Sequence, residues 1–130
     1  MKVCGIELKA NNIILCIVNN GQYEENKIKK IQLLDDENQN EIFELRNNIE
    51  TFLIRNDIKK VIIKKRAKKG NFAGGAITFK IESIIQLNNI CKVEFISGQT
   101  LSKFQKKNEI IFPSNLNKYQ EQAYLSAIYE

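Results

Sequence analysis

The sequence predicts an α/β protein in which a mixed five-stranded sheet carries helices on both faces. Hydrophobic residues first recur with the alternation of strands, up to Leu34, and afterwards with the spacing of helices separated by short apolar strands. The resulting order, β-β-β-α-β-α-β-α, is typical of an antiparallel meander followed by strands that right-handed crossovers join. With 130 residues, of which 43% are hydrophobic and 27% charged, the chain is expected to form one domain, residues 1–130.

Three strands are expected at the beginning of the chain. The segment VCGIELKANNIILCIVNNG has apolar and β-branched residues on both sides of Asn11 and Asn12, which predicts a β-hairpin with a two-residue turn. This turn would place Cys16 opposite Glu7. Residues 27–34, KIKKIQLL, alternate charged and apolar side chains, which predicts a third strand with one solvent-exposed face.

Helical periodicity begins at Glu41, where apolar residues fall on one helical face and Asn38 or Asn40 is available as the N-cap. The segment KKVIIKK is apolar at consecutive positions, which is typical of a strand covered on both faces and predicts a central parallel strand. A second helix follows the glycines after this strand, and CKVEFIS is the fifth strand.

The C-terminal part is expected to be helical. The segment TLSKFQKKN predicts a short basic helix or loop, and Pro113 marks the break before a last helix over residues 115–129. The residues of this helix that we expect to point inward are Leu116, Tyr119, Ala123, Ala127 and Ile128.

The composition excludes several kinds of site. The chain has no histidine, which removes Ser-His and Cys-His nucleophiles and any histidine base. Its three cysteines have no close pair spacing, so the usual zinc patterns cannot be assembled. Catalysis would need carboxylates, lysines or metal ions. No segment has the length of a membrane-spanning helix or the pattern of a signal peptide, so we expect a cytoplasmic protein without a membrane partner.

The most unusual segment is VIIKKRAKKGNFAGG, residues 61–75. Seven of the twenty cations lie between residues 59 and 69, and without them the net charge of +5 would become negative. Glycines let backbone N–H groups approach an anion, and the following helix N-terminus favours phosphate, although a charged surface turn is the alternative. Phe72 would stack on a base or fill the core. The expected nucleic-acid-binding residues are Lys64, Lys65, Arg66, Lys68, Lys69, Phe72, Lys103 and Lys106.

The topology, opened by GIEL on the first strand, resembles the ribonuclease H-like superfamily, particularly its Holliday-junction-resolvase branch. The segments VCGIELKANNIILCIV, KGNFAGGAITFKIESIIQL and YQEQAY are similar to a family of small uncharacterised bacterial proteins of that superfamily, over the whole chain. The resemblance implies a ribonuclease H-like domain with a phosphodiesterase site. In such a site, acidic residues from the first strand, the fourth strand and the last helix hold Mg²⁺ or Mn²⁺.

Two acidic residues match this pattern and one position departs from it. The resemblance implies that Glu7 in GIEL and Glu121 in YQEQAY are the metal ligands and catalytic residues. Lys64 or Lys65 stands where the acidic residue of the fourth strand is expected, which places a cation where a metal ion would bind. If hydrolysis persists, Lys65 or its neighbour Lys64 would stabilise charge in the transition state.

Each acidic residue also has a structural interpretation. Glu7 would form an ion pair with Lys64 or Lys65 across neighbouring strand ends, and Glu121 would be a solvated residue on the flank of its helix. Glu82 or Glu94 would have to supply the missing carboxylate from elsewhere.

These observations leave two functional interpretations. The first is a nucleic-acid-associated ribonuclease H-like domain with a degenerate or altered metal-dependent nuclease site, which binds phosphates through residues 59–69. The alternative is a non-catalytic regulatory or interaction module, as a homodimer or with its basic edge against an acidic protein partner. Residues 27–34 would form the exposed edge strand of such a dimer, although their lysines act against edge pairing.

Overall fold

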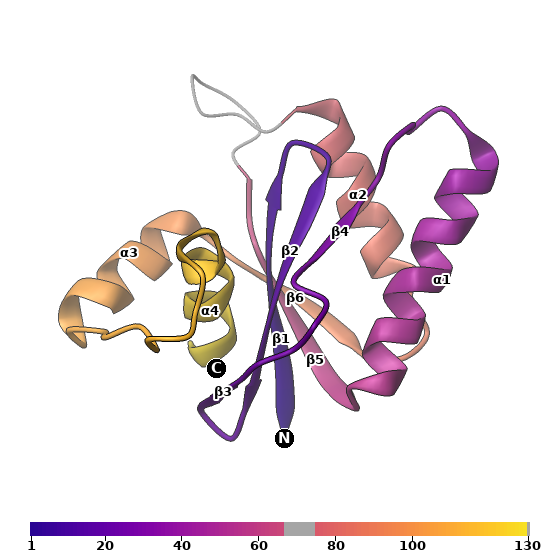
Figure 1. The fold of residues 1–130 in the computed structure, drawn as a ribbon. Helices are drawn as coiled ribbons and strands as arrows, with labels where there is room; N and C mark the ends of the chain where they lie inside the picture. Colours follow the sequence, from indigo (N-terminus) through magenta and orange to yellow (C-terminus); the bar gives the residue numbers. More distant parts are fainter. Residues whose placement is uncertain (67–74, 130) are drawn as a thin grey trace.

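The structure, a computed structural model, describes residues 1–66 and 75–129. Within them, one mixed sheet has the strand order β3-β2-β1-β5-β6, with β4 also paired to β2 (Figure 1). The strands are β1 (Lys2–Lys9), β2 (Asn12–Asn19), β3 (Gln22–Glu24), β4 (Lys30–Gln32), β5 (Ile58–Lys64) and β6 (Lys92–Ile96). The mixed sheet of the prediction is confirmed, and the parallel strand β5 is central as expected.

The first hairpin turns one residue earlier than predicted. Lys9 pairs with Asn12, so Ala10 and Asn11 form the turn, and Gly5 rather than Glu7 lies opposite Cys16. The side-chain amide of Asn11 donates to the carbonyl of Leu33, and the Asn11 carbonyl accepts from the N–H of Leu33. These two contacts with a distant segment hold Asn11 inside the turn, and a local pattern of residues does not reveal them.

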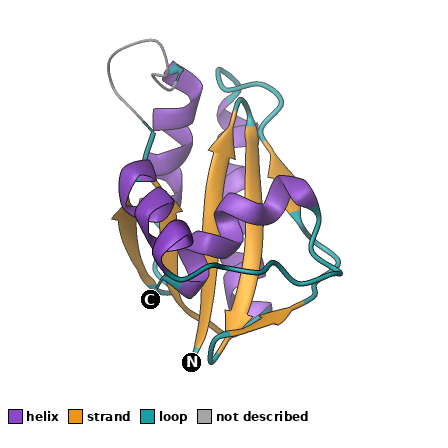
Figure 2. Cartoon of the chain, turned by 90° about the vertical axis from the view of Figure 1, so that its left-hand side faces the viewer, coloured by secondary structure: helices purple, strands orange, loops and turns teal. Residues whose placement is uncertain are grey.

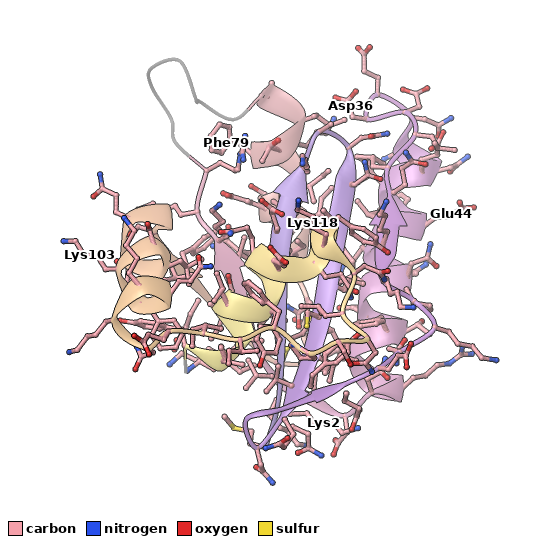
Figure 3. All side chains as sticks on the ribbon, turned by 60° about the vertical axis from the view of Figure 1, so that its left-hand side comes forward. Lys2, Asp36, Glu44, Phe79, Lys103 and Lys118 are labelled. Carbon is pink, nitrogen blue, oxygen red and sulfur yellow. The ribbon has the colours of Figure 1, made fainter. Side chains whose placement is uncertain are left out.

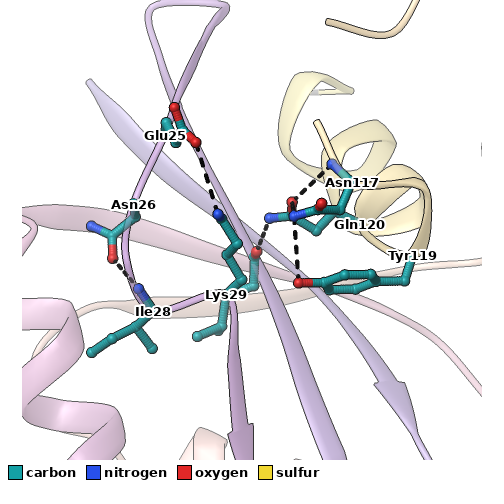
Figure 4. A network of polar contacts seen from close by, with 8 residues as sticks. Glu25, Asn26, Ile28, Lys29, Asn117, Tyr119 and Gln120 are labelled. Atoms are coloured by element: carbon teal, nitrogen blue, oxygen red, sulfur yellow. Dashed lines mark hydrogen bonds and ion pairs between the residues drawn. The ribbon is translucent and has the colours of Figure 1, made fainter. Parts of the chain in front are cut away.

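The predicted third strand over residues 27–34 shrinks to β4, and β3, which the sequence did not predict, precedes it and gives the sheet of the described residues six strands instead of five. The two short strands pair with opposite ends of β2. Asn26 accounts for the interruption, because its side-chain oxygen accepts from the N–H of Ile28 and bends the chain there (Figure 4). Between the two strands, the N–H of Leu15 donates to the carbonyl of Lys29. The Leu15 carbonyl accepts from the buried side-chain amide of Gln120 at 3.0 Å.

Helices cover both faces of the sheet, as predicted (Figures 1 and 2). The helices are α1 (Gln39–Arg55), α2 (Ala76–Gln86), α3 (Gly98–Lys107) and α4 (Glu121–Ile128), with a 3₁₀ turn, η1 (Lys118–Gln120), directly before α4. Of the two expected N-caps for α1, Asn38 is the one that caps it, accepting from the N–H groups of Asn40 and Glu41. The basic segment after β6 forms the helix α3. In the described part of the chain, none of the helices has the length and apolarity needed to cross a membrane.

Two hydrophobic cores lie on opposite faces of the sheet. Along β1, Cys4, Ile6 and Leu8 belong to the core beneath α1 and α2. Val3 belongs to the core beneath α3 and α4. Because successive side chains of a strand point to opposite faces, Glu7 shares the face of Val3 and points toward α4.

The last helix begins later than predicted, at Glu121 instead of residue 115. Asn117 and Gln120 form a capping interaction in which the Gln120 side-chain oxygen accepts from the backbone N–H of Asn117 at 3.2 Å. Tyr119 therefore lies in the turn before the helix, with 38% of its surface exposed. The expectation that it points into the core is wrong. Leu116 packs partly buried against the core from the preceding coil.

Helix α4 packs directly on the backbone of β1. A Cβ atom at Gly5 would lie 1.8 Å from the carbonyl oxygen of Ala123 and 2.7 Å from the nitrogen of Ala127. Only glycine permits this approach. The contact brings the N-terminus of α4 to the end of β1 where the Glu7 side chain lies.

Candidate functional site

The candidate site lies where β1 and β5 end. Glu7 near the end of β1 and Lys64 at the end of β5 lie on the face that α3 and α4 cover, and the Lys64 Nζ is 3.9 Å from the Glu7 Oε2. The two side chains are mostly buried, with 12% of the Glu7 side chain and 21% of the Lys64 side chain exposed. The structure thus contains the expected ion pair of Glu7, and its partner is Lys64.

The Lys64 side chain lies against the beginning of α3. A Cβ atom at Gly98, the first residue of that helix, would lie 3.4 Å from the Cε of Lys64. Ser97 caps the helix by accepting from the N–H of Thr100. The ammonium group is therefore close to the positive end of a helix dipole as well as to a carboxylate.

Lys65 takes a different position. It is exposed, and its backbone N–H donates to the carbonyl of Ile96 at 2.7 Å. Alternation along the strand directs its side chain to the face opposite Lys64. Of the two lysines that the sequence left open, Lys64 is the one that contacts Glu7.

A hollow separates Glu7 from the N-terminal end of α4. Its volume is about 580 Å³, and both Glu7 and Glu121 line it. Its other lining residues are Lys9, Asn117, Lys118, Tyr119 and Gln122. The structure therefore brings the two predicted carboxylates to one surface feature.

The other acidic candidates lie elsewhere. The Glu94 carboxylate pairs with the ammonium groups of Lys60 at 2.9 Å and Lys92 at 3.1 Å. Hydrogen bonds from Lys60 and Lys92 lower the pKa of Glu94 below its ordinary value. Glu82 belongs to α2, which covers the opposite face of the sheet. Neither residue supplies the missing carboxylate beside Glu7.

The predicted nucleic-acid-binding residues do not all gather at this edge. Arg66 follows Lys65 and is half-buried, and Lys106 is exposed in the last turn of α3. Lys103, which Figure 3 labels on α3, lines a second hollow of about 310 Å³ with Tyr129, beyond the C-terminal end of α4. Glu121 lies at the other end of that helix. The remaining expected residues, Lys68, Lys69 and Phe72, lie outside the described residues.

The donor set at this edge does not fit a pair of divalent metal ions. Among residues 1–66 and 75–129, no group of three or more cysteine or acidic side chains is placed to hold a metal ion. Mg²⁺ and Mn²⁺ prefer several oxygen ligands, and a lysine ammonium supplies none and repels a cation. The carboxylate of Glu7 already has the ammonium group of Lys64 as its counter-ion.

Sequence reasoning missed Tyr119, Asn117 and Lys118 as part of the site. All three line the hollow, and the Lys30 ammonium lies 4.2 Å from the centre of the Tyr119 ring. The spacing of Asn117 and Gln120 is the signal that reveals them, because an Asn followed three residues later by Gln is typical of a helix start. A helix start at these residues places Tyr119 before the helix and not on its inward face.

A family model described as "Protein of unknown function (DUF3010)" matches residues 1–130. The chain belongs to this family. No curated protein matched the DUF3010 chain.

Two solved structures of RuvC from Thermus thermophilus are similar to the DUF3010 chain in fold. The RuvC complex with a Holliday junction substrate has a TM-score of 0.70 at 10% sequence identity, covering 98% of this chain and 90% of that one. A further RuvC structure has a TM-score of 0.65 at 8% identity, covering 98% and 92% of the two chains. The ribonuclease H-like fold that the sequence predicts is therefore confirmed.

Proposed function

We propose that this DUF3010 chain is a nucleic-acid-binding ribonuclease H-like domain with an altered nuclease site, at which Lys64 binds a phosphate and no metal-dependent hydrolysis occurs. The fold supports a nucleic-acid partner, because the RuvC structure that shares it is in complex with a Holliday junction. The ion pair between Lys64 and Glu7 carries the rest of the proposal.

Electrostatics at the strand ends favour an anion. The ammonium group of Lys64 has three donors, and its distance of 3.9 Å from the Glu7 carboxylate is long for a hydrogen bond. The positive end of α3 lies beside it. A phosphate oxygen at this position would gain from both the ammonium group and the helix dipole.

The same geometry argues against the reaction that the resemblance implies. Mg²⁺ or Mn²⁺ would supply the charge that activates water and stabilises the leaving oxygen in such a nuclease. Glu7 and Glu121 are the residues for those ions, but Lys64 occupies the position of the third carboxylate. We therefore derive no cleavage step for this site.

Binding of an acidic protein partner by the same basic edge is the alternative. A homodimer through residues 27–34 is not part of our proposal, because only Lys30–Gln32 forms a strand there. Salt dependence distinguishes the two partners, since nucleic acid releases condensed counter-ions when it binds.

The direct test is binding of fluorescently labelled four-way junction, duplex and single-stranded DNA, measured by anisotropy. We expect affinity to fall on the order of tenfold or more between about 50 mM and about 200 mM salt. Lys64→Glu should abolish binding, whereas Lys92→Glu, which makes the same charge change at the beginning of the neighbouring strand β6, should preserve it. Absence of binding to all three DNA forms at low salt would overturn the proposal.

The claim of no hydrolysis has its own test. The same DNA substrates are incubated with Mg²⁺ or Mn²⁺, and the products of the unsubstituted chain are compared with those of Glu7→Gln. We expect no difference between them. Cleavage that Glu7→Gln removes would show that the site works as a nuclease despite Lys64.

A further inference from the structure

The hollow beside Glu7 has the size and lining of a site for a small ligand. Its volume of about 580 Å³ falls within the usual range of ligand sites, roughly 300–1,000 Å³. It combines an aromatic ring from Tyr119, two ammonium groups from Lys9 and Lys118, and the carboxylates of Glu7 and Glu121. This combination matches the parts of a nucleotide, which has an aromatic base and a negatively charged phosphate.

The Tyr119 ring is accessible and oriented. It is 38% exposed, and the Lys30 ammonium lies 4.2 Å from its centre. Lys30 lines a separate groove beside α1 and is not among the residues that line this hollow. The cation–π contact with Lys30 restrains the ring, and the exposed part of the ring is available to stack on a base.

The turn that carries Tyr119 is anchored to the sheet (Figure 4). Gln120 is 2% exposed, and its side-chain amide donates to the Leu15 carbonyl of β2. Its side-chain oxygen accepts from the backbone N–H of Asn117 at 3.2 Å and from the Asn117 side-chain amide at 3.1 Å. These bonds fix both ends of the turn, so the stacking surface is formed before a ligand arrives.

The charged groups complement the remaining parts of a nucleotide. Lys9 and Lys118 are exposed at the border of the hollow and offer ammonium groups to a phosphate. Within the described residues, no hydrogen bond or ion pair occupies the Glu121 carboxylate. A carboxylate accepts hydrogen bonds from base amino groups.

We propose that this hollow binds one unpaired nucleotide of a nucleic acid, with its base stacked on Tyr119 and its phosphates at Lys9 and Lys118. The inference rests on the nucleic-acid binding proposed above and specifies the form of nucleic acid. A base inside a duplex is stacked between its neighbours and cannot reach a protein ring unless it leaves the stack. The chain should therefore prefer single-stranded or unpaired segments to continuous duplex.

The test uses two variants at one position, Tyr119→Leu and Tyr119→Phe, with a single-stranded oligonucleotide and a matched duplex, both containing 2-aminopurine. Stacking on Tyr119 should quench the fluorescence of 2-aminopurine in the single strand. Tyr119→Leu should remove this quenching and weaken single-strand binding by about fivefold to 100-fold, while leaving duplex binding unchanged. Tyr119→Phe retains the ring and should behave as the unsubstituted chain.

Circular dichroism of both variants should show unchanged folding, because Tyr119 is outside the core. If Tyr119→Leu binds the single strand with full affinity and full quenching, the nucleotide site is wrong while nucleic-acid binding through Lys64 stands. If no oligonucleotide binds to the unsubstituted chain, the proposed function fails and this inference fails with it.

Discussion

The ammonium group of Lys64 lies 3.9 Å from the carboxylate of Glu7, where two parallel strands end beneath α3 and α4. The pair explains how an acidic residue is accommodated on a strand that is otherwise apolar, because a mostly buried carboxylate needs a counter-ion. In the function that we propose, the ammonium group of this pair binds an anion at the edge where a metal ion would otherwise bind.

The first prediction concerns the energy of this pair. Lys64→Met should lower the free energy of unfolding, because it leaves the Glu7 carboxylate without its counter-ion. In a double-mutant cycle with Glu7→Gln, urea unfolding should give a coupling of about 1 kcal/mol, since the two side chains are largely but not fully buried. Lys65→Met is the matched control and should give no coupling with Glu7→Gln.

The second prediction concerns the packing of α4 on β1. Gly5→Ala should destabilise the fold by about 3 kcal/mol or more, because the new methyl group would lie 1.8 Å from a backbone oxygen that cannot move independently. Thermal unfolding measures the effect. Gly75→Ala has no atom within 4 Å of the added Cβ and should shift the melting temperature little. Equal effects of the two substitutions would contradict the close packing.

The third prediction concerns the anchor at the end of η1. Gln120→Leu removes the donor to the Leu15 carbonyl and leaves that buried oxygen unpaired, so it should cost about 1–3 kcal/mol. Gln86→Leu, at an exposed position on α2, should change stability by less than about 0.5 kcal/mol. Urea unfolding of both variants provides the comparison, and a neutral Gln120→Leu would show that the bond is dispensable.

The fourth prediction is a pH dependence. Burial raises the pKa of Cys16 from 9.0 to about 12. Above pH 9.0 the thiol of the unfolded chain ionises while the folded one stays neutral, so unfolding releases a proton and stability falls as the pH rises toward the folded value. Between pH 9.0 and the folded value, the unfolding free energy of the unsubstituted chain should therefore fall with pH. Cys16→Ala removes the thiol and should make this fall less steep by about 1.4 kcal/mol per pH unit.

A cavity control separates this effect from simple loss of packing. Val18 is buried on the same face of β2 and does not ionise. Val18→Ala should therefore lower the free energy of unfolding by an amount that does not change with pH. If Cys16→Ala shows the same slope as Val18→Ala, ionisation of Cys16 does not contribute to the alkaline loss of stability.

Local patterns predict most of the fold because most helices and strands are determined by the residues within them. The apolar run of β5 identifies that strand without knowledge of the rest, and the N-cap candidates Asn38 and Asn40 locate the beginning of α1. The predictions fail where a hydrogen bond from a segment far away in the sequence determines the local structure. Asn11 is held by Leu33, and the side chain of Gln120 completes a gap in the ladder of β2.

The candidate site is predictable only in part for the same reason. The resemblance carried by GIEL and YQEQAY points to Glu7 and Glu121, and the fold brings both to one hollow. The choice between Lys64 and Lys65 depends on which face of β5 each residue occupies. Lys103 fails to join the site because α3 carries it toward the other end of α4.

Binding of Mn²⁺, followed by electron paramagnetic resonance, tests most directly whether Lys64 replaces a metal ligand. The account predicts no saturable binding by the unsubstituted chain at concentrations up to about 1 mM, and tighter binding by Lys64→Glu, which adds a carboxylate beside Glu7. Lys59→Glu should resemble the unsubstituted chain. Saturable Mn²⁺ binding by the unsubstituted chain that Glu7→Gln removes would contradict the account.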